Sequence, residues 1–157
     1  MDNNGSSKDH GQAAVLRKLA WFRYELRKFL RFSEQASRSA GITPQQHQLM
    51  LGIGGYTGRG WATVSELADF LQERHNAVVM LVERAAKKGL VTKKHDAADR
   101  RFVAVSLTPR GASILVRLSA LHKQEVARLQ RFLATAGGYS LRTAVKQGSV
   151  RSVSPRT

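Results

Sequence analysis

The chain has 157 residues, the length of a single globular domain with a core of ordinary size. Its 26 Lys and Arg residues outnumber 11 Asp and Glu residues, and the formal net charge of +15 favours a polyanionic partner, nucleic acid before an anionic membrane surface. There is no cysteine, which excludes disulfides, thiolate-bound zinc and thiol-based redox sensing.

No apolar run in the chain approaches the roughly 18 residues that a membrane-spanning helix needs. The polar N-terminus also lacks the hydrophobic region of a signal peptide. We therefore expect a cytoplasmic protein with no membrane partner.

The N-terminal third of the chain predicts one long helix. Residues 1–12 are polar, and we expect them to be disordered. A helical pattern then runs over residues 13–40, where basic residues crowd the remaining faces. This helix either packs within its own subunit or is shared across a dimer interface, and its pattern alone leaves both open. Its apolar stripe is Val15, Leu19, Phe22, Leu26, Phe29 and Leu30.

A second helix is predicted to begin at Thr43. Thr43 suits the N-cap, Pro44 suits the first helical position, and Gln46 completes a capping box. The glycine-dense stretch 52–60 then follows. It lacks the preceding strand and the Gly-Lys-Ser/Thr ending of a phosphate-binding loop, so we interpret it as a flexible connector.

The segment 63–108 contains the most informative pattern in the chain. Thr63 and Glu66 form a second capping box, and two short apolar stripes at helical spacing follow, separated by residues 72–74. Two short helices with such a break are typical of a helix-turn-helix, whose second helix enters the major groove of DNA. Gly89 ends the second helix.

Two strand patterns follow at residues 90–94 and 102–107, the only clear ones in the chain. The polar loop 95–101 joins them into an antiparallel hairpin, which predicts a winged helix-turn-helix. Thr108-Pro109 then starts another long helix, over residues 109–136. The basic segment 139–157 either closes a dimer as a short helix or forms a mobile tail. The apolar stripe of the last long helix is Ile114, Leu115, Leu118, Leu121, Val126, Leu129, Phe132 and Leu133.

Asp99-Arg100-Arg101, followed by the run from Val103 to Gly111 and preceded by Lys-Lys-Gly-Leu-Val, resembles the wing of the MarR family of transcriptional regulators. The resemblance implies a mainly α fold with a small β-hairpin wing, dimerised through long N- and C-terminal helices. One domain would then span residues 13–138. Its winged helix-turn-helix occupies residues 43–108, and its dimerisation helices occupy 13–40 and 109–136.

The candidate DNA-binding residues face away from the apolar stripe of the second helix or flank it. Asn can pair with adenine and Arg with guanine, whereas Ala can meet a thymine methyl group. The alternative for any one of these residues is that it lies on an ordinary solvent-exposed helix face and does not bind DNA. The candidates are Thr63, Ser65, Arg74, His75, Asn76, Ala77, Val79, Met80, Arg84, Lys87, Lys88 and Lys93.

The family resemblance adds three residues of the wing. It implies that Arg100 and Arg101 enter the minor groove, where narrow A·T-rich stretches attract arginine. It also implies that Asp99 holds Arg101 in position. The alternative is that these charges only keep the hairpin soluble.

Relatives often bind a small aromatic or anionic effector between the dimer helices and the winged part, so the resemblance implies such a ligand here. The histidines show no metal-ligand spacing, and no nucleophile and base are arranged for catalysis, so we expect neither a cofactor nor an enzyme. Residues that could line the effector site are Arg17, Trp21, His47, Met50 and Trp61.

Taken together, these patterns predict a homodimeric repressor that binds a palindromic operator in double-stranded DNA and is released by a small ligand. The alternative is a basic architectural nucleic-acid-binding protein with a winged fold and no operator specificity. Membrane-surface binding through the first helix fits less well, because its apolar face suits packing. Preference for a palindrome over bulk DNA separates the first two hypotheses.

Overall fold

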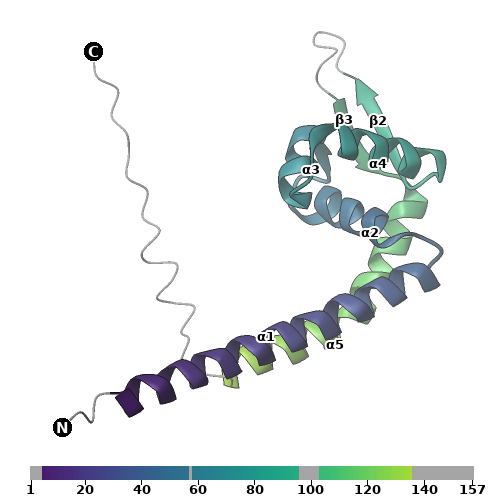
Figure 1. Ribbon diagram of the computed structural model, residues 1–157. Helices are drawn as coiled ribbons and strands as arrows, with labels where there is room; N and C mark the ends of the chain where they lie inside the picture. The colour runs from purple at the N-terminus through teal and green to yellow at the C-terminus, as the bar shows by residue number, and fades with distance from the viewer. Residues whose placement is uncertain (1–4, 57, 96–102, 136–157) are drawn as a thin grey trace, which may run out of the picture. The chain divides into compact units, whose positions relative to one another are not determined.

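The computed structural model describes residues 5–56, 58–95 and 103–135, with side chains from Gln12 onward. Two compact units are present and are described separately. The winged unit comprises residues 27–126, and the terminal unit comprises the described residues before 27 and after 126. The elements along the chain are α1 (Gly5–Ser39), α2 (Pro44–Leu51), η1 (Gly52–Tyr56), β1 (Trp61–Thr63), α3 (Val64–Leu71), α4 (His75–Lys87), β2 (Val91–His95), β3 (Val103–Leu107) and α5 (Pro109–Thr135) (Figure 1).

Helix α1 begins at Gly5 and not near Ala13, so the prediction of disorder was wrong for residues 5–12. Once a helix has nucleated, each further residue adds one backbone hydrogen bond. Residues 5–12 contain no proline to stop that propagation. Polar composition alone was therefore a poor guide to where the helix starts.

Both predicted capping boxes are confirmed. The amide of Gln46 donates to Thr43 Oγ1 at 3.1 Å, and the Thr43 amide donates back to Gln46 Oε1 at 3.0 Å. Thr63 and Glu66 repeat this arrangement at the start of α3. These boxes satisfy amides that the first helical turn would otherwise leave unpaired, and they fix where α2 and α3 begin.

The glycine-dense stretch after α2 was wrongly interpreted as a flexible connector over its first half. Gly52–Tyr56 continues α2 as a π-helical turn. A Cβ at Gly52 would lie 2.9 Å from Phe70 Cδ1, and one at Gly54 would lie 2.9 Å from Leu115 Cδ2. Glycine is present there because neighbouring side chains come close to the backbone.

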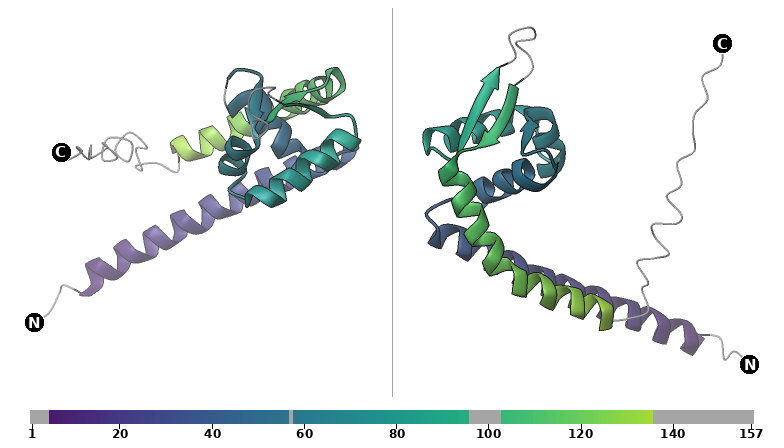
Figure 2. Two further views of the ribbon diagram at one scale, coloured as in Figure 1. Left: turned by 90° about the horizontal axis from the view of Figure 1, so that it is seen from above. Right: turned by 180° about the vertical axis from the view of Figure 1, so that it is seen from behind.

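The predicted hairpin is confirmed, and it belongs to a three-stranded antiparallel sheet in the order β1-β3-β2 (Figure 2, right, shows β2 and β3 side by side). Val105 pairs with Lys93 on one side and with Ala62 of β1 on the other. The sequence did not predict β1, because three residues are too few to show a strand period. Gly89, with φ of 66°, makes the left-handed turn between α4 and β2.

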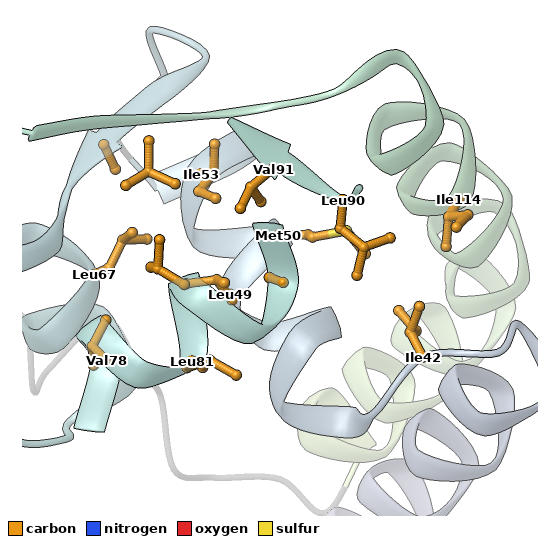
Figure 3. Close-up of a cluster of buried hydrophobic side chains, with 14 of the residues drawn as sticks. Ile42, Leu49, Met50, Ile53, Leu67, Val78, Leu81, Leu90, Val91 and Ile114 are labelled. Carbon is orange, nitrogen blue, oxygen red and sulfur yellow. The ribbon is translucent and has the colours of Figure 1, made fainter. Parts of the chain in front are cut away.

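One hydrophobic core holds the winged unit together, with α2, α3, α4, the sheet and the first turns of α5 each contributing (Figure 3). Helix α4 packs its predicted stripe inward, which leaves its opposite face uncovered. Buried side chains of this core include Leu49, Met50, Ile53, Leu67, Val78, Leu81, Val82, Ala85, Leu90, Val105, Ile114 and Leu118.

The terminal unit has a different character. The Glu25 carboxylate pairs there with the Arg128 guanidinium, and the rings of Trp21 and Tyr24 meet edge to face with centroids 5.5 Å apart. Several large apolar side chains of α1 are exposed, including Val15, Leu16, Leu19, Trp21 and Phe22.

Candidate nucleic-acid interface

The first turn of α3 is fixed by the side chains of Thr63 and Glu66. The Thr63 hydroxyl accepts from the Glu66 amide at 3.2 Å and donates to Glu66 Oε2 at 2.9 Å. The Thr63 backbone N–H, followed by the Arg59 guanidinium, lowers the pKa of the Glu66 carboxyl. Thr63, a predicted DNA-binding residue, thus uses its hydroxyl to cap the helix.

Arg59 extends this arrangement into the loop before β1. Its Nη2 lies 2.6 Å from Glu66 Oε1 and 2.5 Å from Oε2, and its guanidinium carbon lies 3.8 Å from the centroid of the Trp61 ring. Such a cation–π contact beside a charge-assisted pair orients the loop against α3. The sequence analysis did not identify Arg59.

The beginning of α4 is the most exposed part of the helix-turn-helix. Arg74 is the N-cap residue, has extended backbone angles and makes no side-chain cap hydrogen bond. His75, Asn76 and Ala77 are all exposed, and Val78 is the first buried residue. The first turn of α4 contains no acidic residue, and its N-terminal amides carry the positive end of the helix dipole, which favours an anion.

A groove of about 350 Å³ lies beside this helix start. It runs between the start of α3, one side of α4 and the hairpin strands β2 and β3. The structure brings five predicted DNA-binding residues, Thr63, Ser65, His75, Val79 and Lys93, together in its lining. The remaining lining residues are Val64, Val82, Glu83, His95 and Val103.

Glu83 is the one acid among the described residues that line this groove, and the sequence analysis missed it. Its carboxylate pairs with the Lys93 ammonium on β2, and this partner lowers the pKa of Glu83. The pairing joins a helix to a strand across ten residues of sequence. A search for basic residues along α4 could not have found it, because the pair depends on how β2 packs beside the helix.

The remaining predicted residues of α4 lie further along the helix. Met80 is 56% exposed, and Arg84, Lys87 and Lys88 are exposed near the C-terminal end. At 1.5 Å per residue, Lys87 is about 18 Å along the axis from His75. The predicted set therefore divides into a group at the helix start and a basic group at its end. Asp99, Arg100 and Arg101 lie outside the described residues.

The predicted effector residues do not form a site within either unit. His47 and Met50 are buried in the winged unit at 2% and 0% exposure, because they lie on the inward face of α2. Trp61 is covered by Arg59. Arg17 and Trp21 are exposed on α1 in the terminal unit.

Metal-binding and membrane-spanning features are both missing from the described residues. No group of three or more His, Cys, Asp or Glu side chains is placed to hold a metal ion in the part of the chain that the structure describes. No helix within the same residues is long and apolar enough to cross a membrane.

Residues 40–101 match the model of the MarR family, and this range covers α2, the helix-turn-helix and β2. Over these residues the chain is similar to the MarR family. It is 28% identical over 99 residues to the HTH-type transcriptional repressor MdtR of Bacillus subtilis, and the match covers 63% of the chain and 62% of MdtR. The chain thus spans less than two thirds of the length of that MarR-family relative.

Solved structures of MarR-family proteins share the fold. A mutant MarR from E. coli complexed with operator DNA aligns with a TM-score of 0.59 at 21% identity, covering 85% of this chain and 91% of that one. BpsR of Bordetella bronchiseptica, studied for regulation of its DNA binding by 6-hydroxynicotinic acid, aligns with a TM-score of 0.58 at 20% identity, covering 82% and 92%. The winged helix-turn-helix fold is therefore confirmed.

Proposed function

We propose that this protein is a homodimeric transcriptional repressor of the MarR family that binds a palindromic operator in double-stranded DNA. One observation carries the proposal. The first turn of α4 is uncovered and presents the exposed side chains of Arg74, His75 and Asn76 beside a groove, on a chain with a formal charge of +15. Repression is proposed because MdtR is a transcriptional repressor, and DNA is proposed as the partner because the E. coli MarR mutant was solved with operator DNA.

In this proposal α4 lies in the major groove with its first turn toward the bases. Arg74 and Asn76 are exposed there and carry the side chains that pair best with guanine and adenine. Ser65, at the start of α3, and the basic end of α4 contact phosphates. Lys93 reaches a phosphate only after its pairing with Glu83 is broken.

The wing completes the proposed contact. Arg100 and Arg101 enter the minor groove, and Asp99 positions Arg101, as the family resemblance implies. Strands β2 and β3 support this role, because they carry the chain up to His95 and back from Val103 as a paired hairpin.

Dimerisation is proposed from the exposed apolar side chains of α1. Val15 is 55% exposed, Leu19 50% and Phe22 39%, and they recur at helical spacing. A second copy of the chain would remove this surface from water. With two-fold symmetry, the half-sites would lie about 10 base pairs apart, centre to centre.

We also propose that a small aromatic acid regulates DNA binding, as 6-hydroxynicotinic acid does for BpsR. Arg17 and Trp21 of α1 offer a cation and an aromatic ring, and both are exposed. His47 and Met50 are buried in the winged unit, whereas Trp61 is half-buried beneath the Arg59 guanidinium. As a DNA-binding transcriptional regulator, the protein would act in the cytoplasm and would need no cofactor.

The runner-up is an architectural protein without operator specificity, which the high positive charge favours. Selection of bound sequences from random duplexes, followed by competition with bulk DNA, distinguishes the operator-specific repressor from the architectural protein. A specific regulator should enrich a palindrome and prefer it by roughly a thousandfold or more. Enrichment of no motif, with similar affinity for all duplexes, would support the architectural protein.

A further inference from the structure

Three helices of the winged unit meet at two buried histidines. His47 on α2 is 2% exposed and His122 on α5 is 9% exposed, and their ring centroids are 5.1 Å apart. From α1, the rings of Phe29 and Phe32 approach His122 edge-on, with centroid distances of 5.9 and 5.2 Å. Ionisable rings thus replace apolar side chains where α1, α2 and α5 pack together.

Each ring uses one nitrogen as a hydrogen-bond donor. The Ser37 hydroxyl donates its only hydrogen to the Ser33 carbonyl at 2.7 Å, so His47 Nδ1, 3.1 Å from Ser37 Oγ, is assigned as the donor of that contact. His122 Nδ1 lies 2.6 Å from the Leu118 carbonyl, which can only accept. Two neutral rings satisfy both contacts.

The second nitrogen of the His122 ring is Nε2. That atom is buried and has no hydrogen-bond partner among the described residues. Burial first, and His122 second, lower the pKa of His47 to about 4. Proton uptake therefore opposes this packing.

The charged groups around the pair are few. Helix α2 carries no Asp, Glu, Lys or Arg. On the adjoining part of α1, Arg31 is exposed, and Glu34 pairs with Arg38 at 3.9 Å with both side chains largely exposed. On α5, three charged residues lie within five positions of His122, namely Arg117 and Lys123, which are exposed, and Glu125, which is half-buried.

We propose that His47 and His122 form a proton-sensitive latch, in which two neutral rings hold α2 against α1 and α5 and proton uptake releases α2. Helix α2 also packs against α3 and α4, so its release would reach the helix-turn-helix. The proposal concerns the fold alone and does not depend on the proposed function.

The direction of the pH effect follows from the lowered pKa of His47. The stabilisation is fully present above the unfolded pKa of about 6.5 and is lost as pH falls towards the folded value of about 4. Within that window, His47 alone should raise the unfolding equilibrium constant about tenfold for each pH unit of acidification.

The test is urea unfolding of the full chain at several pH values between about 7 and 5, for wild type, His47→Gln and His75→Gln. Gln at position 47 can keep the bond to Ser37 but cannot titrate. Because His47→Gln removes one titrating group, its unfolding equilibrium constant should rise about tenfold less per pH unit of acidification than that of wild type. His75→Gln, which removes an exposed histidine, should keep the wild-type dependence.

Hydrogen exchange locates the effect. In wild type, acidification should expose amides of α2 and of α1 residues 29–37 before those of the sheet, once intrinsic exchange is corrected. Equal pH dependence in wild type and His47→Gln would overturn the proposal. If His47→Gln does not fold, the NMR titration of the wild-type histidine rings decides, since a pKa near 6.5 for His47 would also overturn it.

Discussion

The Glu83 carboxylate on α4 pairs with the Lys93 ammonium on β2, inside the groove proposed to face DNA. The pair connects the proposed recognition helix to the wing. It also neutralises a lysine that could otherwise meet a phosphate. Binding DNA with Lys93 therefore requires that the ammonium exchange one anionic partner for another.

Glu83→Gln should strengthen binding to all duplexes. The substitution removes a negative charge from the groove and frees Lys93 for a phosphate, which should steepen the salt dependence by about one unit for each subunit in contact. Fluorescence anisotropy at several salt concentrations measures both quantities. Glu34→Gln is the matched control, because it removes an exposed carboxylate of α1 that does not line the groove. Weaker binding by Glu83→Gln on every duplex would mean that the ion pair is needed to hold the wing.

Thr63→Ala should lower the free energy of unfolding by about 1 kcal/mol, the usual effect of losing an N-cap side chain. It removes the acceptor of the Glu66 amide and a donor to the Glu66 carboxylate. Ser65→Ala, two positions later and exposed, should change stability by less than about 0.5 kcal/mol. Chemical denaturation of both variants gives the comparison, and equal losses would argue against the capping role.

Gly111→Ala should destabilise the winged unit by about 1–3 kcal/mol or more, because overpacking forces the backbone to shift. A Cβ at Gly111 would lie 2.1 Å from the Leu90 carbonyl oxygen, which is backbone and cannot rotate away. Gly55→Ala is the matched control, since a Cβ there meets nothing within 4 Å. Thermal unfolding should show a large decrease in Tm for the first variant only. A wild-type Tm for Gly111→Ala would contradict the close approach of α5 to the α4–β2 turn.

Much of the winged unit could be predicted from the sequence, because its signals are local. Capping boxes, apolar stripes at helical spacing and a glycine at the end of α4 each act over a few residues. Other features depend on contacts between distant segments. The strand β1 is defined by its pairing with β3. Gln72 adopts a left-handed conformation (φ 54°), which the sequence did not predict because the residue is not glycine.

The candidate site was predictable in the same uneven way. Exposure of Asn76 and its neighbours follows from the helical period, since the opposite face is apolar. The burial of His47 does not, because a polar residue on α2 gives no sign that it will meet Ser37 and His122. Glu83 was missed because its partner lies on a strand ten residues later.

The exposed stripe of α1 predicts assembly. The protein should sediment as a dimer at micromolar concentration without DNA, and Leu19→Asp with Phe22→Asp should convert it to a monomer by placing charge in the apolar stripe. Ala20→Asp adds the same kind of charge at an exposed position beside the stripe and should leave the dimer largely intact. A wild-type monomer that still binds a palindrome as one unit would contradict the proposed interface.

Base readout by the first turn of α4 is the central claim, and Asn76→Ala tests it most directly. The measurement is the ratio of affinities for the selected operator and for a scrambled duplex of equal length, at one salt concentration. A bidentate pair contributes about 1–3 kcal/mol of discrimination, so the ratio should fall about 5- to 150-fold for each subunit in contact, while binding to the scrambled duplex is nearly unchanged. An unchanged ratio, or an equal loss of affinity for both duplexes, would contradict the claim that α4 reads sequence through Asn76.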